Sequence, residues 1–164
     1  MKILKVAKMN FEGIKKSAII YYFIFICVII GLMVVSRGII TMSGIEVSTI
    51  IFLFVCGLNS FKSNFYFAKS NGISRKIFIE GLLISSIPIA LVMSIIDIII
   101  NRISNIFIKS PTLYDMIYGN LSVYSGLVYE NNWVQSNSFT NIINTFLFQF
   151  SFCLLAYIAG IVIN

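Results

Sequence analysis

The sequence predicts an all-α, polytopic membrane protein with four transmembrane helices in a single transmembrane domain, residues 1–164. Three observations lead to this prediction. Of the 164 residues, 59% are hydrophobic and 11% are charged, whereas a soluble domain usually carries about 25% charged residues. The apolar residues gather in long runs, and the mean hydropathy is +0.96. The lysines and arginines lie mostly at the ends of those runs, where they set topology.

Composition also excludes several classes of function. The net charge of +6 does not indicate nucleic-acid binding, because the basic residues flank apolar runs and there contact anionic headgroups. Histidine is absent, so neither a zinc site built on histidine nor His-based catalysis is available. The three cysteines lie in apolar runs and are expected to act as small hydrophobic residues. We predict no catalytic residue, no metal ligand and no cofactor in this chain.

The N-terminal segment, residues 1–16, is amphipathic at helical spacing. Ile3, Val6, Ala7, Asn10 and Ile14 share one side, and lysines occupy much of the rest. This pattern predicts an interfacial helix on the cytoplasmic surface, from which the chain turns into the membrane at Gly13. A solvated basic tail is the alternative.

Four apolar runs follow. The first has no charge between Lys16 and Arg37, and those 20 positions span about 30 Å as a helix, the thickness of one bilayer core. The predicted transmembrane helices are 17–35, 45–61, 77–100 and 139–163.

The distribution of basic residues gives the orientation. Lysines and arginines are frequent in the N-terminal segment and between the second and third helices, and sparse in the two other connections. We therefore expect both termini in the cytoplasm. The bias toward isoleucine, asparagine, lysine and phenylalanine suggests a low-GC bacterium, which indicates a multi-pass protein of the bacterial cytoplasmic membrane.

Polar residues inside the last two predicted helices are candidates for function. Pro88 is expected to kink the third helix. The serines that precede it, Ser85 and Ser86, are expected to donate hydrogen bonds to the carbonyls that the kink frees. Asp97 lies roughly 31 Å past Lys76 along the helix. We expect it at the outer interface with water or Arg102 as its partner, and an intramembrane functional charge is the alternative. Gln149 is expected to make an inward polar contact near the midplane.

The connection 101–138 is expected outside the cytoplasm. Ser110, Pro111 and Asp115 fit a helix start with serine as the cap. Its tyrosines and Trp133 suit a segment that lies on the outer membrane surface. Substrate gating is the alternative role.

The segment 62–76 between the second and third helices carries the most specific pattern. Asn71 and Gly72 predict a helix stop, and Ser74 is expected to cap the next helix. Residues 62–70 would then form a separate short helix. Arg75 and Lys76 at a helix N-terminus oppose the helix dipole, so we expect anionic headgroups or an acidic partner surface to contact them. Glu80 is expected to pair with Lys76.

This turn resembles the one found in membrane subunits of type-2 ABC exporters. The shared pattern is, in chain order, a small residue, a glycine, an isoleucine or valine, a serine, two basic residues and an aromatic residue. They correspond here to Asn71, Gly72, Ile73, Ser74, Arg75, Lys76 and Phe78. The resemblance implies a coupling helix seated in a groove of a separate ATP-binding subunit, whose ATP-driven closure moves the third helix. The residues implicated in coupling are Phe65, Phe67, Lys69, Asn71, Gly72, Ile73, Ser74, Arg75 and Lys76.

The same resemblance implies a second membrane subunit, identical or different. Pairs of small residues four apart are candidates for packing in that dimer. They are Gly81 with Ser85, and Ala156 with Gly160. The chain lacks the phosphate-binding motif G-x-x-x-x-G-K-[ST], so ATP would bind to another chain. Such subunits typically have six helices, and the sequence ends inside an apolar run, so we expect the native chain to continue past Asn164.

Two functions remain open. The first is a membrane subunit of an ATP-driven exporter of a peptide, antibiotic or lipid-like molecule. The second is a small non-transporting membrane protein, such as an immunity or sensor-accessory subunit, that binds a partner in the bilayer. Catalysis is not expected, because Glu80 and Asp97 lie about 26 Å apart along one helix.

Overall fold

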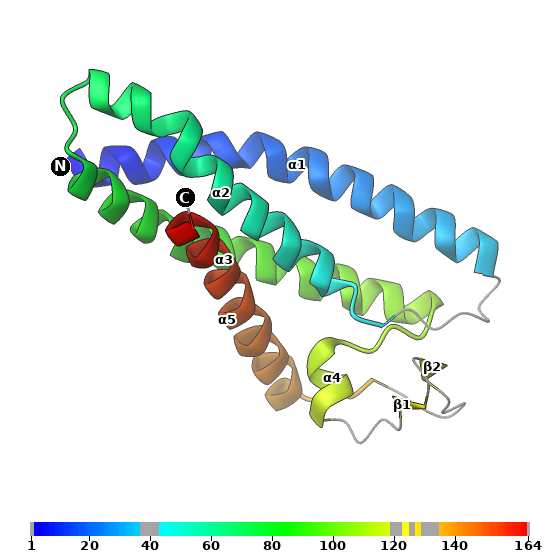
Figure 1. Ribbon diagram of the computed structural model, residues 1–164. Helices are drawn as coiled ribbons and strands as arrows, with labels where there is room; N and C mark the ends of the chain where they lie inside the picture. Colours follow the sequence, from blue (N-terminus) through cyan, green and yellow to red (C-terminus); the bar gives the residue numbers. More distant parts are fainter. Residues whose placement is uncertain (1, 37–42, 119–122, 125–126, 129–134, 164) are drawn as a thin grey trace.

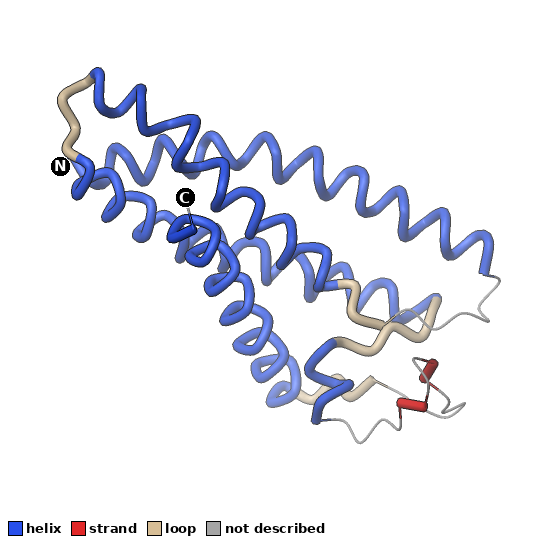
Figure 2. The backbone as a smooth tube through the Cα atoms, in the orientation of Figure 1, coloured by secondary structure: helices blue, strands red, loops and turns tan. Residues whose placement is uncertain are grey.

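The structure is a computed structural model that describes residues 2–36, 43–118, 123–124, 127–128 and 135–163. Its elements are α1 (Lys2–Ser36), α2 (Glu46–Ser70), α3 (Arg75–Phe107), α4 (Leu113–Tyr118), β1 (Val123–Tyr124), β2 (Leu127–Val128) and α5 (Phe139–Ile163). Apart from the short antiparallel β1–β2 pair, the described regular structure is helical (Figures 1 and 2). Helices α1, α2, α3 and α5 are long and apolar enough to cross a membrane. The all-α prediction with four candidate spans is confirmed at this level.

The two most extensive contacts between long helices join α2 to α5 and α1 to α3, and we call these the two helix pairs; the contact of α3 with α5, which joins the pairs, is almost as extensive as that of α1 with α3. Helix α2 packs most extensively on α5, and α1 packs on α3, while α3 also contacts α5. Contacts between α1 and α2 are sparse. The N-terminus and the α2–α3 turn lie at one end of the bundle, whereas α4 and the two strands lie at the other (Figure 1).

Helix α1 corrects the expected turn at Gly13. The predicted interfacial segment and the first predicted span form one uninterrupted helix from Lys2 to Ser36. A single glycine inside a helix costs only about 1 kcal/mol, and the buried Val6, Ala7 and Asn10 pack against the other helices. The amphipathic face was predicted correctly, but it is covered by protein.

The second helix also runs further than expected. Helix α2 continues from Glu46 to Ser70, so the separate short helix predicted for residues 62–70 is the end of α2. No glycine or proline interrupts the chain between Phe61 and Ser70, which explains the continuity. The predicted stop and restart are present: Gly72 has φ of 68°, and the Ser74 side chain accepts a hydrogen bond from the backbone N–H of Ile77.

Helix α3 begins at Arg75, directly after the predicted cap Ser74 and two residues before the predicted span 77–100, and it ends at Phe107, seven residues after the end of that span. It runs through Pro88 without interruption. Ser85 and Ser86 donate to the carbonyls of Leu82 and Leu83. These carbonyls lie two residues and one residue before the carbonyl of Ile84, which the proline leaves without its helical donor. The expected serine contacts therefore satisfy different carbonyls.

Helix α4 starts later than the sequence suggested. Its cap is Thr112, whose hydroxyl accepts from the Asp115 N–H at 3.0 Å, while the Asp115 carboxylate accepts from the Thr112 N–H at 3.2 Å. This reciprocal arrangement is a capping box, so Ser110 is not the cap. Helix α5 has the predicted bounds, Phe139–Ile163. Arg37 and the predicted interfacial residue Trp133 lie outside the described residues.

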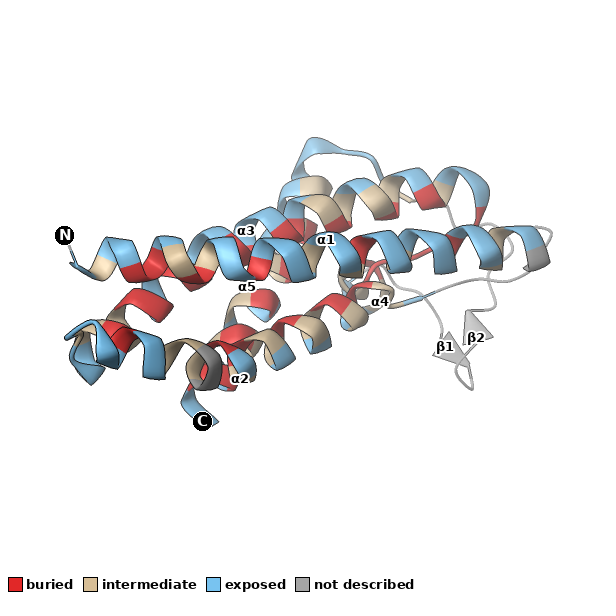
Figure 3. Cartoon of the chain, turned by 90° about the horizontal axis from the view of Figure 1, so that it is seen from above, coloured by how far each residue is buried: buried red, intermediate tan, exposed pale blue. Residues whose placement is uncertain are grey.

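The bundle buries both apolar and polar side chains and leaves many large apolar side chains exposed; Figure 3 colours each residue by its burial. Large apolar side chains such as Ile19, Phe23 and Leu155 are exposed, whereas Asn10, Thr49 and Ser94 are fully buried. The buried stripes of the helices face one another, and the exposed apolar surfaces face outward. Such a surface is suited to lipid, where exposed apolar groups carry no penalty.

Candidate functional site

The basic turn projects a group of exposed side chains from the end of the bundle. Tyr66 and Phe67 on the last turns of α2 are 75% and 61% exposed. Lys69, Arg75 and Lys76 are also exposed. None of these is covered by the described residues. We call the surface made by Tyr66, Phe67, Lys69, Arg75 and Lys76 the basic turn surface.

An aromatic cluster holds this turn against the bundle. The Phe65 ring lies 5.0 Å from Phe61 and 5.5 Å from the fully buried Phe78 of α3, measured between centroids. The Arg75 guanidinium lies 5.7 Å from the Phe61 ring centroid, a cation–π distance. The cluster joins the end of α2 to the start of α3, so the turn and both helices are connected without a flexible linker.

The remaining predicted coupling residues have structural roles in the turn. Asn71 donates from its side chain to the Phe67 carbonyl, and the Ile73 N–H donates to the Ala68 carbonyl. Gly72 supplies the left-handed backbone conformation. The expected Lys76–Glu80 ion pair does not form. Among the described residues, the one ion pair joins Lys8 to Glu12. Lys76 is therefore left available to an external partner, which its exposure permits.

Further into the bundle, Asn10 organises a buried hydrogen-bond network. Its Nδ2 donates to Ser85 Oγ at 2.6 Å and to the Tyr157 hydroxyl at 2.7 Å. The Tyr157 hydroxyl also lies 2.9 Å from Ser60 Oγ. The network connects α1, α2, α3 and α5. Ser85 was predicted from the sequence as a packing residue. Tyr157 was not predicted, because no sequence pattern relates it to Asn10, which lies 147 positions earlier.

A second buried network surrounds Asp97 and corrects its expected pairing with water or Arg102. Asp97 is 4% exposed. Its Oδ1 accepts from the hydroxyls of Tyr22 and Thr49, both at 2.9 Å, and its Oδ2 accepts from Gln149 Nε2 at 2.8 Å. The inward contact expected of Gln149 is present. Arg102 instead donates to the Ser136 carbonyl and to Asn137 Oδ1, so it is not the partner of Asp97.

The helical position of Asp97 explains the error. The rise per residue fixes how far along α3 the carboxylate lies, but not which side of the helix carries it. Asp97 shares the buried side of α3 with Ala90, Met93 and Asn101. Three neutral donors satisfy the carboxylate there.

The predicted small-residue pairs pack within the chain. A Cβ at Gly81 would meet the Val6 side chain at 2.7 Å, so α1 approaches α3 through Gly81. Gly160 faces Gly57 of α2, and a Cβ on Gly160 would lie 3.0 Å from the Gly57 Cα. These faces are thus occupied inside the subunit and are not available for the predicted dimer. Ala156 is half-buried and Pro88 is exposed on α3.

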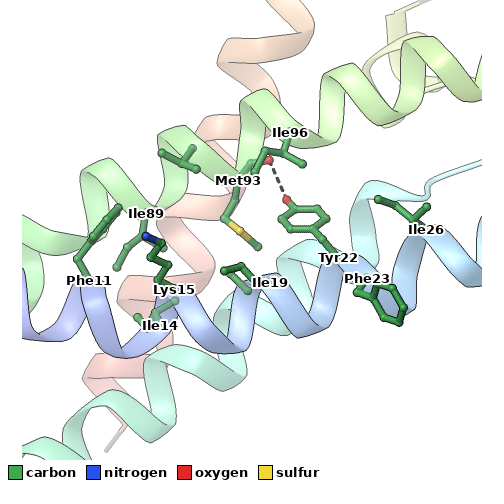
Figure 4. Close-up of a pocket in the computed structure, with 12 residues that line it drawn as sticks. Phe11, Ile14, Lys15, Ile19, Tyr22, Phe23, Ile26, Ile89, Met93 and Ile96 are labelled. Atoms are coloured by element: carbon green, nitrogen blue, oxygen red, sulfur yellow. Dashed lines mark hydrogen bonds between the residues drawn. The ribbon is translucent and has the colours of Figure 1, made fainter.

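An apolar groove of about 490 Å³ opens between α1 and α3. Figure 4 shows Tyr22 reaching from α1 toward α3, where its one hydroxyl hydrogen is shared between the Met93 carbonyl at 3.0 Å and Asp97 Oδ1 at 2.9 Å. Lys15 lies at one end of the groove and supplies its charged group. The other walls are apolar or aromatic. The surface of the groove is therefore suited to contact with hydrocarbon chains.

The far end of the bundle is closed by amides. Asn105 donates to Gln135 Oε1 at 2.6 Å and to the Ser110 carbonyl at 2.8 Å, and Gln135 donates to Asn101 Oδ1 at 2.9 Å. These bonds fix the chain between α3 and α4 against the segment that leads into α5.

Comparison of the chain with protein-family models, with curated proteins and with solved structures gave no match to any of them.

Proposed function

We propose that this chain is a membrane subunit of an ATP-driven ABC exporter and that it couples to a separate ATP-binding subunit through the basic turn surface. The single observation that carries the proposal is the position of this surface. It lies on the connection between α2 and α3, at the end of the bundle where the N-terminus also lies (Figure 1). Exposed Tyr66 and Phe67 next to three cations suit a protein groove with acidic residues.

The packing of the helices supports a coupling role for this turn. Helix α2 belongs to the α2–α5 pair and helix α3 to the α1–α3 pair. The turn is therefore the covalent connection between the two pairs at that end of the bundle. The Phe61, Phe65 and Phe78 rings make the connection stiff. A partner that displaces the turn would move one pair of helices relative to the other, as alternating access requires.

The alternative role of the turn is a plain topology anchor, and a substitution that leaves the charge unchanged separates the two. A Tyr66→Ala/Phe67→Ala variant keeps all cations and should insert normally. The coupling role predicts that this variant no longer recovers an ATP-binding subunit from membranes solubilised in mild detergent. Phe139→Ala is the matched control, since Phe139 is 78% exposed and is the first residue of α5, which begins beside α4 at the opposite end of the bundle (Figure 1).

Mass spectrometry identifies the proteins that copurify with each tagged variant. Recovery of an ATPase with wild type and with Phe139→Ala, and its loss with the double variant, supports coupling. An Arg75→Ala/Lys76→Ala variant, with its orientation checked by protease accessibility, tests the cations in the same assay. If wild type recovers no ATPase, or if the double variant recovers as much as wild type, the coupling role is refuted. A non-transporting membrane protein would then be the better description.

A further inference from the structure

A polar cavity of about 170 Å³ lies between α1 and α2, where these helices make few contacts. Its polar lining residues are Asn10, Ser17, Cys56, Asn59, Ser60 and Asn64. None of the described residues that line it carries a charge. In the predicted orientation it lies at the cytoplasmic end of the first two helices. Polar groups gathered on facing sides of two otherwise apolar helices indicate that this space holds hydrogen-bonding groups rather than lipid chains.

The hydrogen-bond directions in the neighbouring network fix what the cavity offers. Ser85 Oγ donates to the Leu82 carbonyl and Ser60 Oγ donates to the Cys56 carbonyl. Each serine hydroxyl has one hydrogen, so both must accept from their other partners. Ser85 therefore accepts from Asn10 Nδ2. Tyr157 donates to Ser60 and accepts the second hydrogen of the Asn10 amide.

This arrangement uses both hydrogens of Asn10 Nδ2 and identifies Oδ1 as the remaining polar atom of the side chain. Asn10 is 0% exposed, and its Oδ1 has no hydrogen-bond partner among the described residues. A buried acceptor of this kind destabilises the folded protein when it is left unsatisfied. Because Asn10 is fully buried, a donor in the cavity reaches Oδ1 and removes that cost only when the neighbouring side chains move apart.

We propose that the cavity binds a neutral hydrogen-bonding group of the transported molecule, an amide or a hydroxyl, with Asn10 Oδ1 as an acceptor. This inference rests on the proposed transport function and places the first recognition step at the cytoplasmic end of the path. Asn64 lines the cavity and is the residue immediately before Phe65 of the aromatic cluster. Occupation of the cavity and movement of the basic turn would therefore act on the same part of α2.

Two residues of the chain provide a direct test. Cys56 lines the cavity, whereas Cys27 is exposed on α1 and does not line it. One variant keeps Cys56 alone (Cys27→Ser/Cys153→Ala), and the control keeps Cys27 alone (Cys56→Ser/Cys153→Ala). Each is treated in inside-out vesicles with the membrane-impermeant thiol reagent trimethylammonioethyl methanethiosulfonate. The proposal predicts that Cys56 reacts and that Cys27, which faces the hydrocarbon, does not.

Gly13 offers a blocking variant that should still fold. A Cβ at Gly13 meets nothing within 4 Å, and Gly13 lines the cavity. Gly13→Phe in the Cys56-only background should fill the space and suppress labelling. Labelling of Cys56 no faster than that of Cys27, or labelling that Gly13→Phe leaves unchanged, would overturn the existence of an accessible polar cavity.

The ligand class is tested by protection of Cys56 with N-acetylglycinamide, a neutral diamide. Acetate and tetramethylammonium at equal concentration are the charged controls. Protection should be stronger with the amide, and Asn10→Leu should weaken it roughly 2- to 12-fold, the range of one neutral hydrogen bond. Ser17→Val tests a lining hydroxyl without disturbing the buried network. Equal protection by all three probes overturns the proposed ligand class. No ATPase enters this readout, so its failure is distinguishable from failure of the coupling assay.

Discussion

The contact between Gly57 and Gly160 offers a quantitative test of how the helix pairs are held. A Cβ on Gly160 would overlap the Phe54 carbonyl oxygen and would lie 2.9 Å from the Leu58 nitrogen. Both neighbours are backbone atoms, so neither can rotate away as a side chain would. Gly160→Ala should force α2 and α5 apart. Overpacking of this kind costs about 1–3 kcal/mol.

Helix propensity acts in the opposite direction. Alanine is favoured over glycine inside a helix by about 0.8–1.0 kcal/mol. Gly31 of α1 gives a matched control, because a Cβ there meets nothing within 4 Å. Gly31→Ala should therefore keep the propensity gain without a steric cost. The difference between the two variants removes the shared propensity contribution and should equal the steric cost, about 1–3 kcal/mol.

The assay is reversible unfolding in mixed micelles of mild detergent and sodium dodecyl sulfate, followed by circular dichroism. We expect Gly31→Ala to unfold at a higher dodecyl sulfate fraction than Gly160→Ala, and Gly57→Ala to behave as Gly160→Ala does. Equal midpoints for Gly31→Ala and Gly160→Ala would refute the close α2–α5 contact. They would show that these helices do not meet through their backbones.

Three further variants follow from the geometry. Asp97→Leu leaves the donors of Tyr22, Thr49 and Gln149 without an acceptor and should destabilise the protein by several kcal/mol, whereas Asp97→Asn, which keeps an oxygen, should cost less in the same assay. Gly72→Val at φ of 68° should cost about 1–2 kcal/mol; Gly72→Asn should cost less, and similar midpoints would argue against the left-handed turn. Thr112→Ala should cost about 1 kcal/mol through loss of the α4 cap, seen as faster amide exchange at Asp115.

The positions where helices stop were predictable from short-range chemistry. Asn71, Gly72 and Ser74 act on their immediate neighbours, and the structure has the turn and the cap where the residues indicate them. The bounds of α5 were also predicted, because a long run without charged residues contains no other signal for where a helix begins or ends. The false boundary before residue 62 arose from reading a change of composition as a change of structure. Charged residues can continue a helix beyond its apolar part when no breaker intervenes.

The lateral contacts were much less predictable. In a membrane helix both the lipid-facing and the protein-facing sides are apolar, so periodicity does not separate them well. Gly57 was overlooked for this reason, although it is the partner of Gly160. Asp97 shows a second difficulty. Its distance along α3 follows from the rise per residue, but the side of the helix that is buried does not. Hydrogen bonds such as Asn10–Tyr157 depend on how α1 and α5 are placed, which no local pattern encodes.

The two polar networks share one feature: each contains a hydrogen bond that joins one helix pair to the other. The glycine contacts lie inside the pairs, since Gly81 joins α3 to α1 and Gly160 joins α5 to α2. The hydrogen bonds from Asn10 to Tyr157 and from Asp97 to Gln149 instead cross from one pair to the other. Close backbone packing resists sliding, whereas hydrogen bonds between side chains can be exchanged for others at little net cost. Relative motion of the two pairs would therefore break the polar contacts and preserve the glycine contacts. The α2–α3 turn, which joins the pairs at one end, is the place from which an external partner could drive that motion.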